Sequence, residues 1–156
     1  LIINAVNYMN RLELTTSVFR EFGIVQERVD AIFKRRLPAD LPAAQFKLLN
    51  HLIHTTNQHE TVSDIAKHSH VSLPAMSQVI KQLKTKGYVE LEEHRQDSRK
   101  KTVLITKAGR LSHNNALESI DVNLEEFSKK FSMQDMQKLY ELSHIFRCTF
   151  EDHHQV

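Results

Sequence analysis

The hydrophobic pattern of residues 61–106 changes its period, and this change limits the fold more than any other feature of the chain. Up to residue 86, apolar side chains recur every three or four positions, with a break at 69–72. This spacing predicts two short helices joined by a tight turn. Residues 88–92 and 102–105 instead alternate between apolar and polar side chains, which predicts two strands of a hairpin.

Capping residues mark the ends of the two short helices. Thr61 is followed three residues later by an acid, which approximates a capping box before a helix over 62–68. Ser72 is the predicted N-cap of a second helix over 73–86. Gly87 supplies the left-handed residue that ends it.

Long amphipathic helices are predicted on both sides of this segment, over 2–36, 107–131 and 133–150, with a further helix over 42–54. Only three glycines and three prolines occur in 156 residues, which also favours helices. We therefore expect a mainly α fold with a small β-hairpin wing, as one domain over 1–156. A winged helix-turn-helix over about 41–106 would lie between dimerisation helices at about 2–36 and 107–150.

The outer face of the second short helix carries residues suited to DNA. A helix of this length spans about 20 Å, enough to lie across a major groove. Glutamine can bond to adenine, serine reads bases or phosphates, and lysine contacts guanine or phosphate. The outward positions, with the capping serine, are Ser72, Pro74, Ala75, Ser77, Gln78, Lys81 and Lys84. The alternative is a helical core hairpin whose outer face is merely polar.

The connection between the strands, residues 93–101, is expected to form a long charged tip. Its cations are Arg95, Arg99, Lys100 and Lys101. Such a guanidinium can enter a narrow minor groove, where the negative potential is strongest. Asp97 would be repelled by DNA, so we expect it to orient Arg99 or Arg95 through a charge-assisted hydrogen bond. A mobile charged loop is the alternative.

Positive charge is concentrated in the same third of the chain. Residues 60–110 hold ten lysines or arginines against six acids, whereas the remainder holds eleven against thirteen. This asymmetry is typical of a polyanion binder, although a solvated helix face would give the same count.

Residues 41–109 resemble the MarR (multiple antibiotic resistance regulator) family. The matching segments are Leu-Pro-Ala-Ala-Gln-Phe at 41–46, Val-Ser-Asp-Ile-Ala at 62–66, Val-Ser-Leu-Pro-Ala-Met-Ser at 71–77, Lys-Gly-Tyr-Val at 86–89, and the wing signature from Asp97 and Arg99 to Ile105-Thr106. Two positions depart from the family pattern: His70 replaces a common glycine, and Ile105 replaces leucine. His70 must therefore either adopt or avoid a left-handed conformation.

The resemblance implies a homodimer whose first and last two helices intertwine. It also implies a repressor that binds double-stranded DNA at pseudo-palindromic sites and releases it when a small molecule binds. Five residues taken from the apolar stripes are the candidates for lining a site for a small aromatic or apolar effector: Phe19, Phe22, Phe46, His51 and Leu111. Whether the protein represses or activates, and which genes it controls, stays open.

Metal and redox sensing are the alternatives to a small-molecule effector. The chain has ten histidines but no HxxxH pair, so we expect solvated or core histidines, no metal site and no cofactor. Cys148, the single cysteine, lies in the last predicted helix, where the dipole does not favour a thiolate. We expect it to be a packing residue.

Several other function classes find no support in the sequence. It has no glycine-rich phosphate loop, nucleophile elbow or recognisable carboxylate pair, so we expect no enzyme. No apolar stretch is long enough for a membrane span, and a lone cysteine suits a reducing cytoplasm. The remaining alternative is a winged helix that binds another protein.

Overall fold

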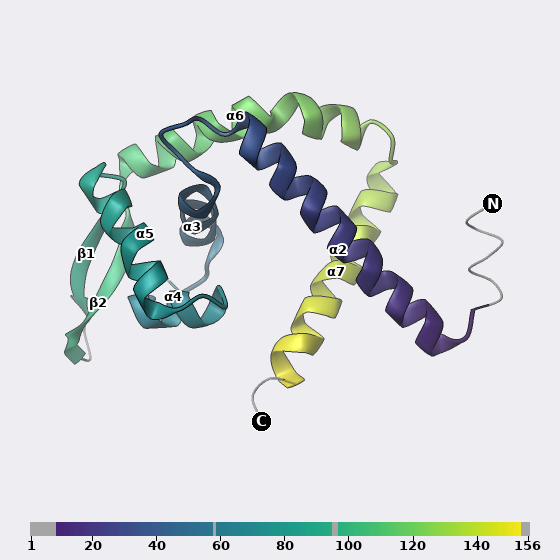
Figure 1. Cartoon of the computed structure of the whole chain (residues 1–156), viewed down its shortest axis with the longest axis horizontal. Coiled ribbons are helices and arrows are strands. Elements are labelled where there is room, and N and C mark those ends of the chain that lie inside the picture. The colour runs from purple at the N-terminus through teal and green to yellow at the C-terminus, as the bar shows by residue number, and fades with distance from the viewer. Residues whose placement is uncertain (1–8, 58, 95–96, 154–156) are drawn as a thin grey trace. The chain divides into compact units, whose positions relative to one another are not determined.

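The computed structural model of the chain describes residues 9–57, 59–94 and 97–153, without the side chains of 121–124 and 150–153. A two-stranded antiparallel sheet is set among the helices, so the predicted mainly α fold with a hairpin wing is confirmed. The elements, in chain order, are α2 (Arg11–Arg36), α3 (Ala43–His54), α4 (Val62–His68), α5 (Leu73–Thr85), β1 (Val89–His94), β2 (Asp97–Ile105), α6 (Lys107–Ser128) and α7 (Met133–His153) (Figure 1).

The chain forms two compact units, residues 1–119 and 120–156. In the first unit, α3, α4, α5 and the hairpin enclose the main core, whose most deeply buried side chains include Leu49, Ile65, Leu83 and Val89. A bridge between Thr61 and Thr102 attaches the start of α4 to β2. No helix among the described residues is long and apolar enough to cross a membrane.

The predicted helix-turn-helix is confirmed with its caps. Thr61 and Asp64 form a reciprocal capping box at the start of α4, and Ser72 accepts a hydrogen bond from the Ala75 N–H at the start of α5. Gly87 has φ +73° and ends α5, while the N–H of the following tyrosine bonds to the Leu83 carbonyl.

His70, in the turn between α4 and α5, adopts the left-handed conformation with φ +51°. The structure thereby decides between the two conformations open to this residue. Few residue types other than glycine accept this region, and histidine is among the less penalised of them.

Helix α2 starts later than its apolar pattern predicted. It begins at Arg11 and not near residue 2, because Asn10 and Glu13 form a capping box. The Asn10 side chain accepts the Glu13 N–H at 3.0 Å, and the Glu13 carboxylate accepts the Asn10 N–H at the same distance. Residues 1–8, where the predicted helix began, lie outside the described part of the chain.

The predicted loop over 93–101 is wrong, because both strands continue into it. Strand β1 reaches His94 and β2 starts at Asp97, so Arg99 and its neighbours lie on a strand. Glu93 pairs with Lys101 across the hairpin, with 3.1 Å between the Lys101 Nζ and the Glu93 carboxylate. Opposite charges facing each other stabilise strand pairing, which explains the extension.

Among the large apolar residues of α6 whose side chains are described, only Ile120 is buried, so most of the apolar stripe expected to face inward is exposed. Leu111, Leu117 and Phe127 are exposed, whereas His113, Ala116 and Ile120 are buried. The helix begins directly after the predicted N-cap, Thr106, whose side chain accepts the Gly109 N–H. It ends at residue 128, three residues before the predicted end. A histidine and an alanine do not register as an apolar stripe, which explains the error.

His113 connects α6 to α3 inside the core. Its ring is 2% exposed, lies parallel to Phe46 with 5.0 Å between ring centroids, and has its Nε2 3.1 Å from the Asn50 Oδ1. Burial lowers the pKa of His113 below its ordinary value of 6.5. The folded protein therefore holds this imidazole neutral at a pH where the unfolded chain takes up a proton.

Replacement of His113 should reduce the acid sensitivity of the fold. The stabilisation from neutral His113 is complete above the unfolded pKa of 6.5 and is lost as pH falls through that value towards the lower folded pKa. In His113→Gln, the free energy of unfolding should fall less steeply than in the wild type as the pH decreases below 6.5. Denaturant unfolding across this range measures it, with exposed His59→Gln as the control. An unchanged slope would contradict the account.

Candidate nucleic-acid interface

Helix α5 has one buried and one exposed face. Met76, Ile80 and Leu83 enter the core. The predicted contact residues lie on the opposite, exposed face: Pro74, Ala75, Ser77, Gln78, Lys81 and Lys84, with Ser72 exposed at the N-cap. The structure thus brings together every contact residue that was predicted on this helix. Its 13 residues extend about 20 Å, enough to cross a major groove.

A buried polar side chain holds α5 against α3. The Gln45 Nε2 donates to the Gln82 Oε1 at 2.9 Å, and the Lys86 Nζ donates to the Gln45 Oε1 at 2.6 Å. Lys86 also donates to the backbone carbonyl of Asp40. Lys86 therefore has a structural role, and its charge is turned towards α3. Sequence reasoning missed this network, because the sequence identified Gln45 only as part of segment 41–46, which resembles the MarR family, and gave no sign of its partners.

The wing holds one arginine in a defined orientation. The Arg99 Nε and Nη2 lie 3.0 and 3.4 Å from the two carboxylate oxygens of Asp97, and the Arg99 backbone N–H donates to the same carboxylate. These hydrogen bonds hold the pKa of Asp97 below its ordinary value. The Arg99 side chain is nonetheless 91% exposed.

The predicted orienting contact is therefore present between Asp97 and Arg99. Lys100, the next residue on β2, is exposed. Arg95, the other guanidinium considered for the Asp97 contact, lies outside the described residues. On the same strand, Lys101 forms an ion pair with Glu93. Arg99 and Lys100 are the predicted DNA-contacting cations of the wing that the described part of the chain leaves facing solvent.

The five candidate effector residues have very different surroundings. Phe46 is 4% exposed and packs edge-on against Phe33, whereas Leu111 is 62% exposed. These two side chains therefore differ strongly in their access to solvent. Phe19 and Phe22 are exposed on α2. The half-buried His51 bonds to Glu60, with 2.7 Å between Nε2 and Oε2.

Cys148, in α7, is half-buried one helical turn after His144, and its Sγ lies 3.7 Å from the His144 Nε2. This separation of four residues is a Cys/His spacing that sequence reasoning overlooked. The distance fits a weak hydrogen bond of a thiol within one helix. The packing role expected for Cys148 stays a prediction.

Comparison with known proteins agrees with this geometry. The MarR family profile matches residues 39–100. MarR from E. coli in its apo form is 26% identical, with a TM-score of 0.66, over 81% of this chain and 94% of that one. A cysteine-to-serine mutant of MarR from E. coli, complexed with operator DNA, is 24% identical, with a TM-score of 0.63, over 88% and 99% of the two chains.

Two further structures share the fold. BldR from Sulfolobus solfataricus, a transcriptional regulator, is 19% identical, with a TM-score of 0.73, over 89% of this chain and 99% of that one. BpsR from Bordetella bronchiseptica, whose DNA binding is regulated by 6-hydroxynicotinic acid, is 20% identical, with a TM-score of 0.65, over 84% and 98%. A search of curated proteins found no significant match.

Proposed function

We propose that the chain is a winged helix-turn-helix regulator of the MarR family, which its profile match over residues 39–100 supports. It would repress transcription by binding a pseudo-palindromic operator, from which a small-molecule effector releases it. The observation that carries the proposal is the two-faced helix α5. Its apolar face is anchored in the core, and its polar outer face is exposed along the whole helix. A regulator of this kind acts in the cytoplasm by binding and not by catalysis.

The outer face of α5 would read the major groove. Gln78 can bond bidentately to adenine, and Ser77 and Lys81 can reach base edges or phosphates. Ala75 is small and allows close approach of the helix to the bases. Ser72 and Pro74 would lie at the phosphate backbone, where the N-terminal end of a helix favours negative charge.

The wing would add contacts outside the major groove. Asp97 fixes the guanidinium of Arg99 before DNA arrives, so less side-chain freedom is lost on binding. Arg95, Arg99 and Lys100 are the proposed wing contacts, and a narrow minor groove is the favoured location for Arg99.

A homodimer is the proposed DNA-binding form. Helix α2 has no buried residue along its 26 positions, although it carries several large apolar side chains. In the second unit, Leu139, Leu142 and Ile145 on α7 are also exposed. Exposed apolar faces of this size mark an interface. Two-fold symmetry then requires half-sites about one helical turn of DNA apart.

Effector release is the finer part of the proposal. Recognition helices held one turn of DNA apart lose their register when either winged unit tilts. A ligand that binds the tilted dimer more tightly would therefore weaken DNA binding, and operator DNA would weaken ligand binding by the same factor. The regulation of BpsR by an aromatic acid, 6-hydroxynicotinic acid, supports an effector of this class. Phe19, Phe22, Phe46, His51 and Leu111 remain the proposed lining residues.

Replacement of Arg99 should weaken duplex binding and reduce its salt dependence. We expect Arg99→Ala to lose about 1–3 kcal/mol of binding free energy and about one unit of salt slope, because one groove contact is removed. Fluorescence anisotropy with a labelled duplex at several salt concentrations measures both quantities. Lys138→Ala, an exposed charge change on α7, is the control and should bind as the wild type does. Equal affinity and slope for Arg99→Ala and the wild type would remove Arg99 from the interface.

The salt dependence of the wild type tests the function itself. Binding that neutralises several phosphates weakens steeply as salt is added, since condensed counterions are released from the duplex. A winged helix that binds another protein through an apolar face would show no such dependence and no duplex affinity. Absence of duplex binding at low salt would overturn the proposed function.

A further inference from the structure

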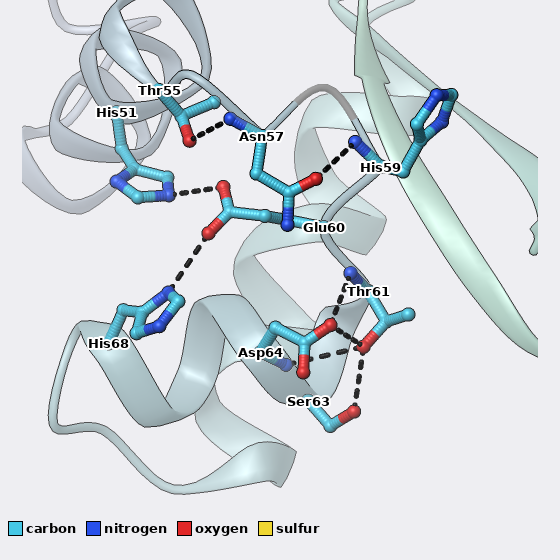
Figure 2. A network of polar contacts seen from close by, with 9 residues as sticks. All are labelled: His51, Thr55, Asn57, His59, Glu60, Thr61, Ser63, Asp64 and His68. Atoms are coloured by element: carbon cyan, nitrogen blue, oxygen red, sulfur yellow. Dashed lines mark hydrogen bonds and ion pairs between the residues drawn. The ribbon is translucent and has the colours of Figure 1, made fainter.

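Two histidines that lie far apart in the sequence converge on one buried glutamate. His51 lies on α3, Glu60 precedes α4, and His68 is the last residue of α4. The two carboxylate oxygens of Glu60 face one ring nitrogen each, with His51 Nε2 at 2.7 Å and His68 Nδ1 at 2.9 Å (Figure 2). Together these three residues form the His51–Glu60–His68 cluster.

The burial of Glu60 makes this cluster unusual. Its side chain is only 3% exposed, whereas those of His51 and His68 are 31% and 59% exposed. A carboxylate removed from water is stable only next to positive charge or strong donors. Imidazole N–H groups can supply such donors, and a divalent cation held between the three residues would supply positive charge directly. The two histidines also leave the cluster open to solvent on their side.

We propose that the His51–Glu60–His68 cluster binds a divalent transition-metal ion of the zinc type. One ligand atom from each residue lies within 4.8 Å of the other two. Ligands of tetrahedral zinc, with bonds of about 2.0–2.2 Å, lie about 3.3 Å from one another. Small side-chain rotations would therefore bring all three onto one ion. Two imidazoles and one carboxylate favour zinc over calcium or magnesium, and water would complete the coordination.

The backbone around the cluster holds Glu60 in place without the metal. The Glu60 carbonyl accepts a hydrogen bond from the Val103 N–H of β2 at 3.1 Å. The next residue, Thr61, caps α4 and bridges to Thr102. Only the imidazoles would have to move, so the site is largely preformed. A bound ion would link α3 to the end of α4, four residues before Ser72. This proposal does not depend on DNA binding.

Zinc titration of the free protein, against a competing chromophoric chelator, tests the proposal. The wild type should bind one equivalent at this site. His51→Gln and His68→Gln should each weaken that binding by at least about tenfold, because each removes a ligand. Glu60→Gln should do the same while keeping the shape of the side chain. His59→Gln is the matched control: His59 is exposed, and Figure 2 shows its ring turned away from Glu60. It should leave the affinity unchanged.

Cobalt spectra distinguish metal binding at this cluster from metal binding at His144 and Cys148 on α7. Co²⁺ at the cluster has only nitrogen and oxygen ligands, so its visible bands should appear without a thiolate charge-transfer band and persist in Cys148→Ser. Thermal unfolding of each zinc-free variant shows whether it is folded. Added zinc should raise the melting temperature of the wild type and should leave that of the three cluster variants unchanged. The proposal is overturned if no zinc binds at micromolar concentration. Equal affinity in the wild type, His51→Gln and His68→Gln would overturn it too.

Discussion

Substitution of Gly109 by alanine is expected to destabilise the protein by about 3 kcal/mol. A Cβ at this position would lie 2.2 Å from the backbone carbonyl oxygen of Tyr88 and 3.0 Å from the Ile105 side chain. The Tyr88 oxygen cannot move freely, because it accepts the Thr106 N–H and the Thr106 hydroxyl donates to the neighbouring Gly87 carbonyl at 2.7 Å. Helix α6 would be forced away from the base of the wing.

Gly23→Ala is the matched control for this substitution. Gly23 lies inside α2, and a Cβ there would have no neighbour within 4 Å. Alanine is the better helix former by about 0.5–1 kcal/mol, so this variant should become slightly more stable. Denaturant unfolding of both variants at one protein concentration measures the difference. Similar stabilities for the two would show that α6 does not approach the wing as closely as described.

Adjacent residues of α5 should separate folding from DNA binding. Leu83 is fully buried, and truncation to alanine would leave a cavity between α5 and its neighbours. We expect Leu83→Ala to lose about 2–5 kcal/mol of unfolding free energy. Lys84 is exposed, so Lys84→Ala should change stability by no more than about 0.5 kcal/mol.

In duplex binding we expect the opposite result: Lys84→Ala should have the large effect and Leu83→Ala the small one. Lys84→Ala should weaken binding to all duplexes alike and lower the salt slope by about one unit, as expected for a phosphate contact. At temperatures where Leu83→Ala stays folded, its duplex affinity should remain close to that of the wild type. A stable Lys84→Ala protein with unchanged affinity at every salt concentration would exclude Lys84 from the interface.

Sequence reasoning succeeded where local signals decide the structure. The caps Thr61, Ser72 and Gly87 each satisfy backbone groups within a few residues of themselves, so their roles can be read from short segments. Asn10 and Glu13 carry the same kind of signal, which a search for Asn-x-x-Glu would have found. The link from Asp97 to Arg99 was likewise predictable, because it joins residues two apart.

The errors arose where contacts between distant segments decide the structure. His113 is buried because Phe46 and Asn50 of α3 receive its ring, and nothing in its own segment indicates this. The cluster on Glu60 was missed for the same reason, since its histidines lie nine residues before and eight residues after it. The sequence around Glu60 is polar, and nothing in it indicates that this side chain is buried. Pairing of Glu93 with Lys101 extended the strands in the same way.

Selection of bound sequences from random duplex DNA tests the central claim, sequence-specific DNA binding, most directly. The wild type should enrich a pseudo-palindrome whose half-site centres lie about 10 base pairs apart. A parallel selection with Gln78→Ala should relax one base position in each half-site, by about 1–3 kcal/mol of discrimination, and leave binding to random DNA nearly unchanged. A wild-type pool in which no sequence is enriched over the starting library would contradict the claim.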